Sequence, residues 1–215
     1  MRALEPQTRF LLRGSALLIG LLTLWWFVLL DPMLYVLKGA AGAFVSIEYT
    51  SSGDWSFHVP LHAILPATPE HPVAREIRSI DFDLSRSDAI AFTFSLPVYW
   101  AIILAAPDVK RSLSPLLLGT ILVSAIEVAL LLVFAEFTAR DAVSQFGGIA
   151  DAEGTWLRRV GEYLIVNVLP YIGPFVVAMS THGKLRAQVF GILPPTESSL
   201  LSAREEQPRA KMRRT

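Results

Sequence analysis

The chain has 215 residues, of which 53% are hydrophobic and 18% are charged, and its mean hydropathy is +0.47. Soluble domains carry about 45–50% apolar and about 25% charged residues, so this composition excludes a disordered chain and argues against an ordinary soluble enzyme. Nineteen basic and nineteen acidic side chains balance, which leaves no general basic surface for nucleic acid. Cysteine is absent, which excludes disulfides, thiolate metal sites and cysteine nucleophiles. A small α-helical membrane protein is indicated.

Four apolar stretches are long enough to cross a membrane, since about 20 helical residues span about 30 Å of hydrocarbon. They are residues 14–30, 89–106, 115–134 and 160–179. The first helix could begin one turn earlier, at Phe10. Trp25, Trp26 and Phe27 lie near the far end of the first stretch, where an aromatic belt is expected. The sequence predicts four transmembrane helices.

Basic residues in the flanks predict the orientation, because lysine and arginine are retained on the cytoplasmic side. Twelve of them lie before the first span, between the second and third spans, and after the fourth, against seven in the two longer loops. We therefore expect both termini to be cytoplasmic.

A cleaved signal peptide is the competing interpretation of the first span. The preceding segment is basic, and the small residues 41–43 follow the span. However, the apolar run is longer than a usual signal-peptide core, and Asp31, Pro32 and Lys38 precede any small-residue site. We expect an uncleaved span.

The segment 31–88 is the longest outside the predicted spans. Asp31 followed by Pro32 is typical of a helix start and predicts a short helix on the membrane surface. Residues 45–50 and 55–61 alternate between apolar and polar around a glycine-containing turn, which predicts a β-hairpin, and residues 77–84 alternate again. A small β-containing extracytoplasmic cap is expected.

The second outer loop, residues 135–159, is expected to continue the third span as a helix through Val143. Gly147 and Gly148 would end this helix, and the fourth helix would start at residues 151–156. The tail, residues 181–215, is rich in proline, serine, glutamate and arginine. It is expected to be a basic, disordered cytoplasmic segment, either solvated or lying against anionic lipid.

Glu127 is the most informative single residue, because it interrupts the third span about 18 Å from its cytoplasmic start. An ionisable group in hydrocarbon is costly and usually faces protein or water. Asn167, Thr23 and Ser95 are expected at similar depth, which predicts an intramembrane polar cluster. Two interpretations remain open: a proton or substrate site, and a protonated glutamate that joins helices by hydrogen bonds.

Prolines interrupt two of the spans. Pro97 lies in the second, and Pro170 and Pro174 lie in the fourth. Since proline removes a helical hydrogen bond and bends the helix, these three positions are predicted hinges or cavity walls, with kinked packing helices as the alternative.

Other chemistry finds little support. His58 and His62 flank Pro60 in an extended pattern, which would hold them roughly 13 Å apart, too far for one metal. No nucleophile-elbow serine motif, zinc-protease motif or phosphate-binding glycine loop is present. We predict no catalytic residue, no metal and no cofactor.

Three segments resemble a bacterial family named for its association with exosortase H. They are RFLLRGSALLIGLLTLWW at residues 9–26, FSLPVYWAIILAAP at residues 94–107 and EYLIVNVLPYIGPFVV at residues 162–177. The resemblance covers the four spans in order, with a weak match in the outer loop, and the chain departs from it in Glu127 and in its longer basic tail. It implies a small membrane protein that accompanies a sorting system for tagged exported proteins. Exosortases are similar to cysteine-dependent transpeptidases, so a chain without cysteine would be an accessory.

The sequence thus predicts an all-α membrane protein of the bacterial inner membrane with four spans and a small β-containing cap. Its divisions are residues 1–30, 31–88, 89–180 and 181–215. The expected function is a non-enzymatic accessory in exosortase-type protein sorting or envelope export, in contact with the lipid bilayer and with a membrane protein such as an exosortase. The alternative is a small transporter subunit or ion-coupled carrier that uses Glu127, and a membrane-embedded hydrolase is the third interpretation.

Overall fold

The computed structural model describes residues 6–65, 67, 73–106, 113–145, 152–183 and 185–186. The elements in chain order are α1 (Pro6–Leu24), a π-helical segment η1 (Trp25–Leu29), α2 (Leu30–Ala41), β1 (Ser46–Tyr49), β2 (Trp55–Leu65), β3 (Arg75–Leu84), α3 (Arg86–Thr93), α4 (Ser95–Ala105), α5 (Leu113–Gln145), α6 (Ala152–Asn167) and α7 (Leu169–Thr181).

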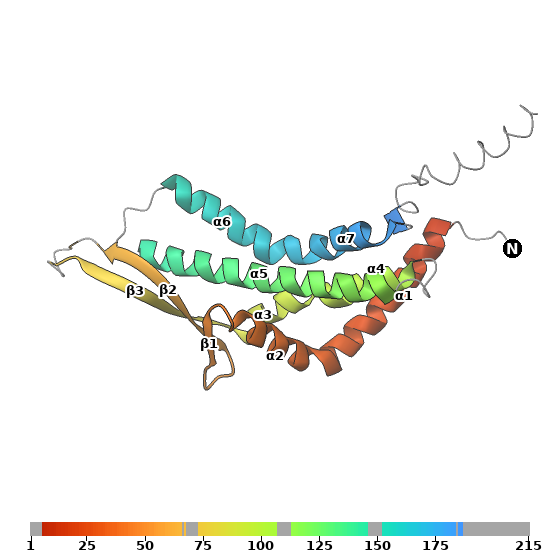
Figure 1. Cartoon of the computed structure of the whole chain (residues 1–215), viewed down its shortest axis with the longest axis horizontal. Coiled ribbons are helices and arrows are strands. Elements are labelled where there is room, and N and C mark those ends of the chain that lie inside the picture. Colours follow the sequence, from red (N-terminus) through yellow and green to blue (C-terminus); the bar gives the residue numbers. More distant parts are fainter. Residues whose placement is uncertain are drawn as a thin grey trace, which may run out of the picture.

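The molecule is elongated, and α5 runs along most of its length (Figure 1). The start of α1, the end of α4, the start of α5 and the end of α7 lie at one end of the molecule. The ribbon formed by β2 and β3, the end of α5 and the start of α6 lie at the other end (Figure 1). The chain is therefore divided into a helical end and an end that carries the sheet.

Among the described residues, three helical stretches are long and apolar enough to cross a membrane: Phe10–Ala41, Arg86–Ala105 and Leu113–Gln145. A fourth would be the pair Val160–Asn167 and Leu169–Thr181, which is bent by 61°. Large apolar side chains are exposed on these helices, including Phe27 on η1, Ile121 on α5 and Val176 on α7. These properties are compatible with a membrane protein.

The first helix does not end where the sequence predicted. Asp31 and Pro32 do not start a separate capped helix, because η1 runs directly into α2 and no side chain caps its start. A proline ring clashes with the carbonyl four residues earlier, and for Pro32 that residue is Val28, inside the wider π-helical turn. The wider turn gives the ring room, and α2 turns away from the line of α1 there (Figure 1).

The predicted extension of the third span is present, since α5 continues as a helix past Val143 to Gln145. The next helix, α6, begins at Ala152, within the range expected for the start of the fourth helix. Gly147 and Gly148, which were expected to end the third helix, lie outside the described residues, as does the tail from residue 187 onward.

The three predicted strands are confirmed as an antiparallel sheet of order β1-β2-β3. Gly53 has φ 86° in the turn between β1 and β2, a conformation that favours glycine. Trp55, Phe57 and Val59 are buried and alternate with more exposed residues along β2, and the Phe57 ring stacks on Phe82 of β3 at 5.2 Å. The alternation in the sequence therefore predicted the hairpin, and the structure shows that its Trp55, Phe57 and Val59 side is the buried one.

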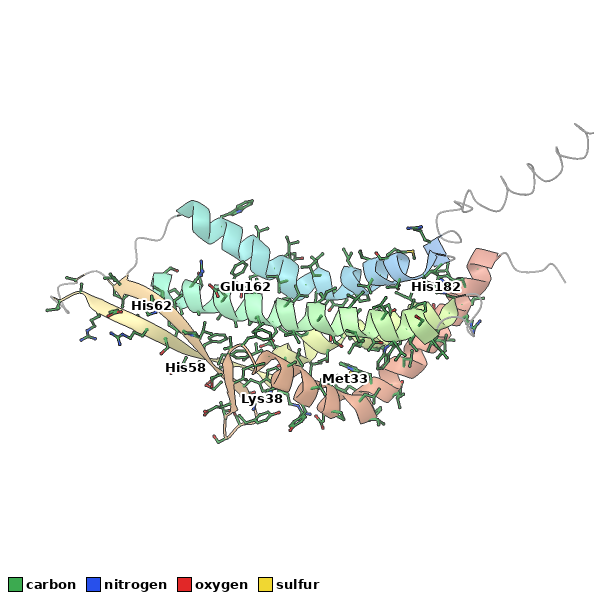
Figure 2. The ribbon with its side chains drawn as sticks, viewed as in Figure 1. Met33, Lys38, His58, His62, Glu162 and His182 are labelled. Atoms are coloured by element: carbon green, nitrogen blue, oxygen red, sulfur yellow. The ribbon has the colours of Figure 1, made fainter. Side chains whose placement is uncertain are left out.

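Two contacts connect the sheet to the helices that flank it in the chain. Lys38 Nζ of α2 lies 3.3 Å from the ring centroid of Tyr49 on β1, and Lys38 is marked in Figure 2. Ser85 caps α3 directly after β3, since its Oγ accepts from the Asp88 backbone N–H at 3.1 Å. Lys38 thus connects α2 to β1, Ser85 fixes the start of α3 where β3 ends, and β2 and β3 pack against α5.

The buried apolar residues form two clusters. The sheet core joins the inner face of the sheet to α2 and to the outer part of α5, and includes Trp55, Phe57, Leu34, Ala135 and Ala139. The helical core joins α4, α5 and α7, and includes Leu96, Tyr99, Ile103, Val123 and Ala178.

Candidate functional site: the groove at Glu127

Glu127 lies on α5 between the two cores. The buried positions of α5 recur every four residues and are Gly119, Val123, Glu127, Leu131, Ala135 and Ala139. Four residues turn a helix about 40° beyond a full circle, so the buried stripe winds about 200° around α5 between its first and last members. The stripe contacts the helical core at one end and the sheet core at the other, and Glu127 lies where the two cores meet.

The Glu127 side chain is 3% exposed. Its carboxyl group interacts with the Ser95 side chain and with the backbone N–H of Leu96 at the start of α4. Its Oε1 atom has no hydrogen-bond partner within the described part of the chain. A buried acceptor without a partner costs about 1–3 kcal/mol, so Oε1 lacks a donor that would offset its burial.

A groove of about 280 Å³ lies between α2, α4 and α5, and Glu127 is one of its lining residues. The α2 side is apolar and includes Met33, Val36 and Leu37. The α5 side carries Thr120, Ser124 and Glu127, which are spaced so that they follow one another along one helix face. The groove thus has one apolar wall and one polar wall.

The polar wall is partly held by hydrogen bonds. Trp100 of α4 donates from Nε1 to Thr120 Oγ1 at 2.9 Å, and Thr120 donates to the Leu116 carbonyl at 2.7 Å. Thr93 lines the groove beside Glu127 and donates to the Ile90 carbonyl. These bonds hold the hydroxyl groups of Thr93 and Thr120 and the Trp100 indole in the walls of the groove.

The structure brings together two of the four residues expected in the polar cluster. Ser95 contacts Glu127 as described. Thr23 is exposed on α1, and its hydroxyl donates to the Ile19 carbonyl one turn earlier. Asn167 lies at the end of α6 and lines a different pocket. The sequence prediction grouped these four residues only because they were expected at a similar depth in the membrane. Depth does not specify which side of its helix a residue occupies.

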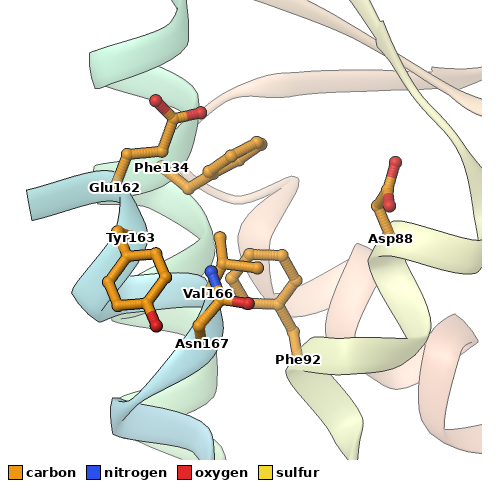
Figure 3. A pocket seen from close by; sticks show the side chains of 7 residues that line it. All are labelled: Asp88, Phe92, Phe134, Glu162, Tyr163, Val166 and Asn167. Atoms are coloured by element: carbon orange, nitrogen blue, oxygen red, sulfur yellow. The ribbon is translucent and has the colours of Figure 1, made fainter. Parts of the chain in front are cut away.

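The pocket that Asn167 lines has a volume of about 380 Å³ and lies between α3, α5 and α6. Two acidic residues, Asp88 and Glu162, lie on opposite sides of it, with Phe92 and Phe134 between them and Tyr163 on the side of Glu162 (Figure 3). Asp88 Oδ2 already accepts from Ser85 Oγ at 2.6 Å, within the cap of α3. This pocket is less enclosed by apolar residues than the groove and has no unpartnered buried oxygen among its described atoms.

The predicted hinge prolines lie at or beside helix boundaries, with one exception. In the predicted second span, α3 and α4 meet at Phe94, whose backbone remains helical (φ −67°, ψ −22°), and Pro97 lies in the first turn of α4. The predicted fourth span breaks at Val168, two residues before Pro170, which lies in the first turn of α7. Pro174 lies inside α7. The 61° bend therefore coincides with Pro170.

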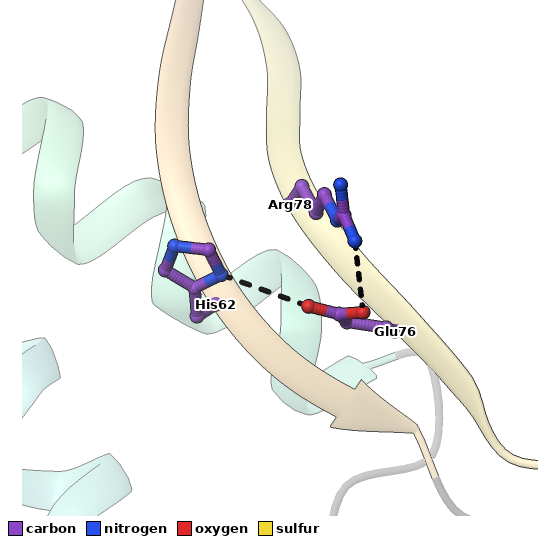
Figure 4. Close-up of polar contacts among 3 residues, drawn as sticks. All are labelled: His62, Glu76 and Arg78. Carbon is purple, nitrogen blue, oxygen red and sulfur yellow. Dashed lines mark hydrogen bonds and ion pairs between the residues drawn. The ribbon is translucent and has the colours of Figure 1, made fainter.

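His58 and His62 point to separate acidic partners on β3. His58 Nδ1 lies 2.6 Å from Asp81 Oδ1, whereas His62 Nδ1 lies 3.9 Å from Glu76, which also pairs with Arg78 at 3.4 Å (Figure 4). Within the described residues, no three histidine, aspartate or glutamate side chains gather closely enough to hold a metal.

Sequence reasoning missed Thr93, Trp100, Thr120 and Ser124 as groove residues. The spacing of Thr120, Ser124 and Glu127 was a visible signal, because residues four and three apart lie on one helix face. The position of α2 opposite them was not visible in the sequence.

Comparison of the chain with protein-family models, curated proteins and solved structures finds no match.

Proposed function

We propose that this chain is a non-enzymatic accessory protein of an exosortase-type sorting or export system in the bacterial inner membrane. In this proposal four spans cross the membrane, both termini are cytoplasmic, and the sheet lies outside. The protein acts by packing against a partner membrane protein, such as an exosortase, while its sheet lies close to the exported substrate.

One observation carries this proposal. α5 is a single helix of 33 residues, which is about 50 Å long, whereas the hydrocarbon layer is about 30 Å thick. Its outer part carries the buried Ala135 and Ala139 and packs against the sheet. One continuous helix therefore extends from the proposed membrane region to the sheet, as expected of a protein that holds an outer surface at a fixed height above the bilayer.

The arrangement of the helix ends supports the proposed topology. The start of α1, the end of α4, the start of α5 and the end of α7 share one end of the molecule (Figure 1). Twelve of the nineteen basic residues belong to the sequence segments that flank these ends, and the cytoplasmic side is where such residues are retained.

The ribbon of β2 and β3 supplies the proposed contact with a partner outside the membrane. Ile64 at the end of β2 is 75% exposed, and Val73 shortly before β3 is 73% exposed. Two exposed apolar residues at the tip of a ribbon that extends away from α2 (Figure 1) suit contact with another protein, since neither side chain supports the sheet core.

A second candidate function is an ion-coupled carrier or transporter subunit that uses Glu127. The buried, unpartnered oxygen of Glu127 in the groove favours it, because ionisable residues inside membranes often mark transport pathways.

Affinity capture of the full chain from its native host in a mild detergent, with mass spectrometry, tests the two functions. The accessory function predicts stoichiometric recovery of a sorting enzyme or an export component. Exchange of Ile64 and Val73 for glutamate should reduce this recovery at unchanged expression, and Glu127→Gln should leave it unchanged. Recovery of the chain alone as a monodisperse homo-oligomer would contradict the accessory function. Loss of proton-coupled transport in Glu127→Gln would then support the carrier.

A further inference from the structure

We propose that the groove at Glu127 binds the end of a linear membrane amphiphile whose head is an uncharged or cationic hydrogen-bond donor, such as a long-chain alcohol or amine. This inference is independent of the proposed accessory function, since it concerns the helices rather than the sheet.

The chemistry of the two walls defines the ligand. An aliphatic chain matches the α2 wall of Met33, Val36 and Leu37, and a donor matches the free Oε1 of Glu127 opposite. The residues that line the groove include an acid but no lysine, arginine or histidine. An anionic head, such as a fatty-acid carboxylate or a phosphate, would therefore meet an acid without a compensating base.

The size of the groove limits how much of the ligand it encloses. Its volume of about 280 Å³ exceeds the roughly 150 Å³ of an apolar cavity that holds benzene and lies near the lower limit of about 300 Å³ for small-molecule sites. It can enclose a head group and the first part of a chain, and the remainder would stay in the lipid.

The position of the groove indicates entry from the bilayer. Glu127 lies about 21 Å from the start of α5 at 1.5 Å per residue, within an apolar stretch of a candidate membrane span. Val36 and Ala40 of α2 line the groove and are exposed, so a chain in the surrounding lipid can reach it past α2.

Trp100 provides an optical readout, because its indole lines the groove. The full-length protein would be placed in phosphatidylcholine nanodiscs, whose head group has no hydrogen-bond donor. Two probes would be added: 6-bromododecan-1-ol, which carries its bromine on the part of the chain that the groove can enclose, and its methyl ether, which has the same chain and no donor. Bromine quenches indole fluorescence on contact, and the Trp100→Phe variant reports the signal of the other tryptophans.

We expect saturable quenching by the alcohol that is lost in Trp100→Phe, and binding of the ether that is weaker by about tenfold, as a hydrogen bond to a charged or buried acceptor predicts. Glu127→Leu should weaken the alcohol about tenfold and leave the ether unchanged, whereas Glu127→Gln, which keeps a carbonyl acceptor, should retain most of the affinity for the alcohol.

Ala40→Leu keeps the test decisive if Glu127→Leu does not fold. This substitution adds bulk on the opposite wall without touching the carboxyl group, and it should weaken both probes together. Equal quenching by the two probes in the wild-type protein, absence of saturation, saturable quenching that persists in Trp100→Phe, or an alcohol affinity that Glu127→Leu does not change would overturn the proposal.

Discussion

The helical core and the sheet core are built by different means. The sheet core relies on large side chains, since Trp55 and Phe57 fill the space between the sheet, α2 and the small alanines of α5. In the helical core, close packing depends on a glycine: because Gly119 of α5 has no side chain, the ring of Tyr99 of α4 can lie against it. The first mode leaves a periodic pattern in the sequence. The second depends on a single glycine among apolar residues, which hydropathy does not distinguish.

The largest effect is expected where the sheet core loses its largest buried side chain. Trp55 is 1% exposed, and Trp55→Ala should cost about 3–5 kcal/mol of stability. If the two cores are separate units, hydrogen exchange measured by mass spectrometry should show faster exchange in β2 and β3 and unchanged protection in α4. Trp156→Ala is the control, because Trp156 is 68% exposed on α6. Equal loss of protection in α4 would show that the cores unfold together.

An intermediate effect is expected in the helical core. A Cβ atom at Gly119 would lie 1.7 Å from Tyr99 Oη, and Tyr99 is fully buried, with its hydroxyl donating to the Pro115 carbonyl at 2.5 Å. Gly119→Ala must displace this ring and should cost about 1–3 kcal/mol, measured as a lower thermal midpoint in detergent.

Gly20→Ala is the matched control for this glycine, because a Cβ atom added at Gly20 on α1 would meet nothing within 4 Å. It should leave the midpoint unchanged or raise it slightly, since alanine favours helix more than glycine. A similar fall in both variants would mean that glycine flexibility, rather than contact with Tyr99, explains the result.

The smallest effect concerns pH and should be confined to the sheet. The hydroxyl of Ser52, and then the backbone N–H of Arg86, donate to the Asp54 carboxylate and hold its pKa below the ordinary value of 3.8. A carboxyl group with a lowered pKa stabilises the fold above its unfolded-state value, and this contribution disappears as pH falls through the folded-state value. Asp54→Asn should therefore lower the thermal midpoint at about pH 6 and have less effect at about pH 3. An equal effect at both pH values would exclude this role for the charge.

The sequence predicted the sheet well because its signals are local. Alternation over residues 55–61 and 77–84 and a turn at Gly53 specify strands without reference to distant parts of the chain. The groove could be predicted only in part. The charge of Glu127 identified it in the sequence, but the sequence did not distinguish Ser95 from Thr23 as its partner. The packing of the helices shows that Ser95 contacts Glu127 and that Thr23 is exposed on α1.

The short helix predicted after Asp31 is present as α2, but it does not begin with a cap at Asp31, and the reason is related. Asp31 and Pro32 have the local chemistry of a helix start, yet α2 continues from the preceding helix through η1. The Asp31 carboxylate instead pairs with Arg86 at the start of α3. Asp31, which the local motif predicted to cap a helix, therefore pairs with a residue 55 positions away in the sequence.

The buried stripe that winds around α5 also limits insertions and deletions of residues within this helix. One inserted residue between Gly119 and Ala139 would rotate the part of α5 beyond it by about 100° and shift it by about 1.5 Å. Either the sheet core or the helical core would then lose its contact with the small residues that face it. Side chains along this stretch can be exchanged one at a time, but the number of residues between the two cores is fixed by the geometry of the helix.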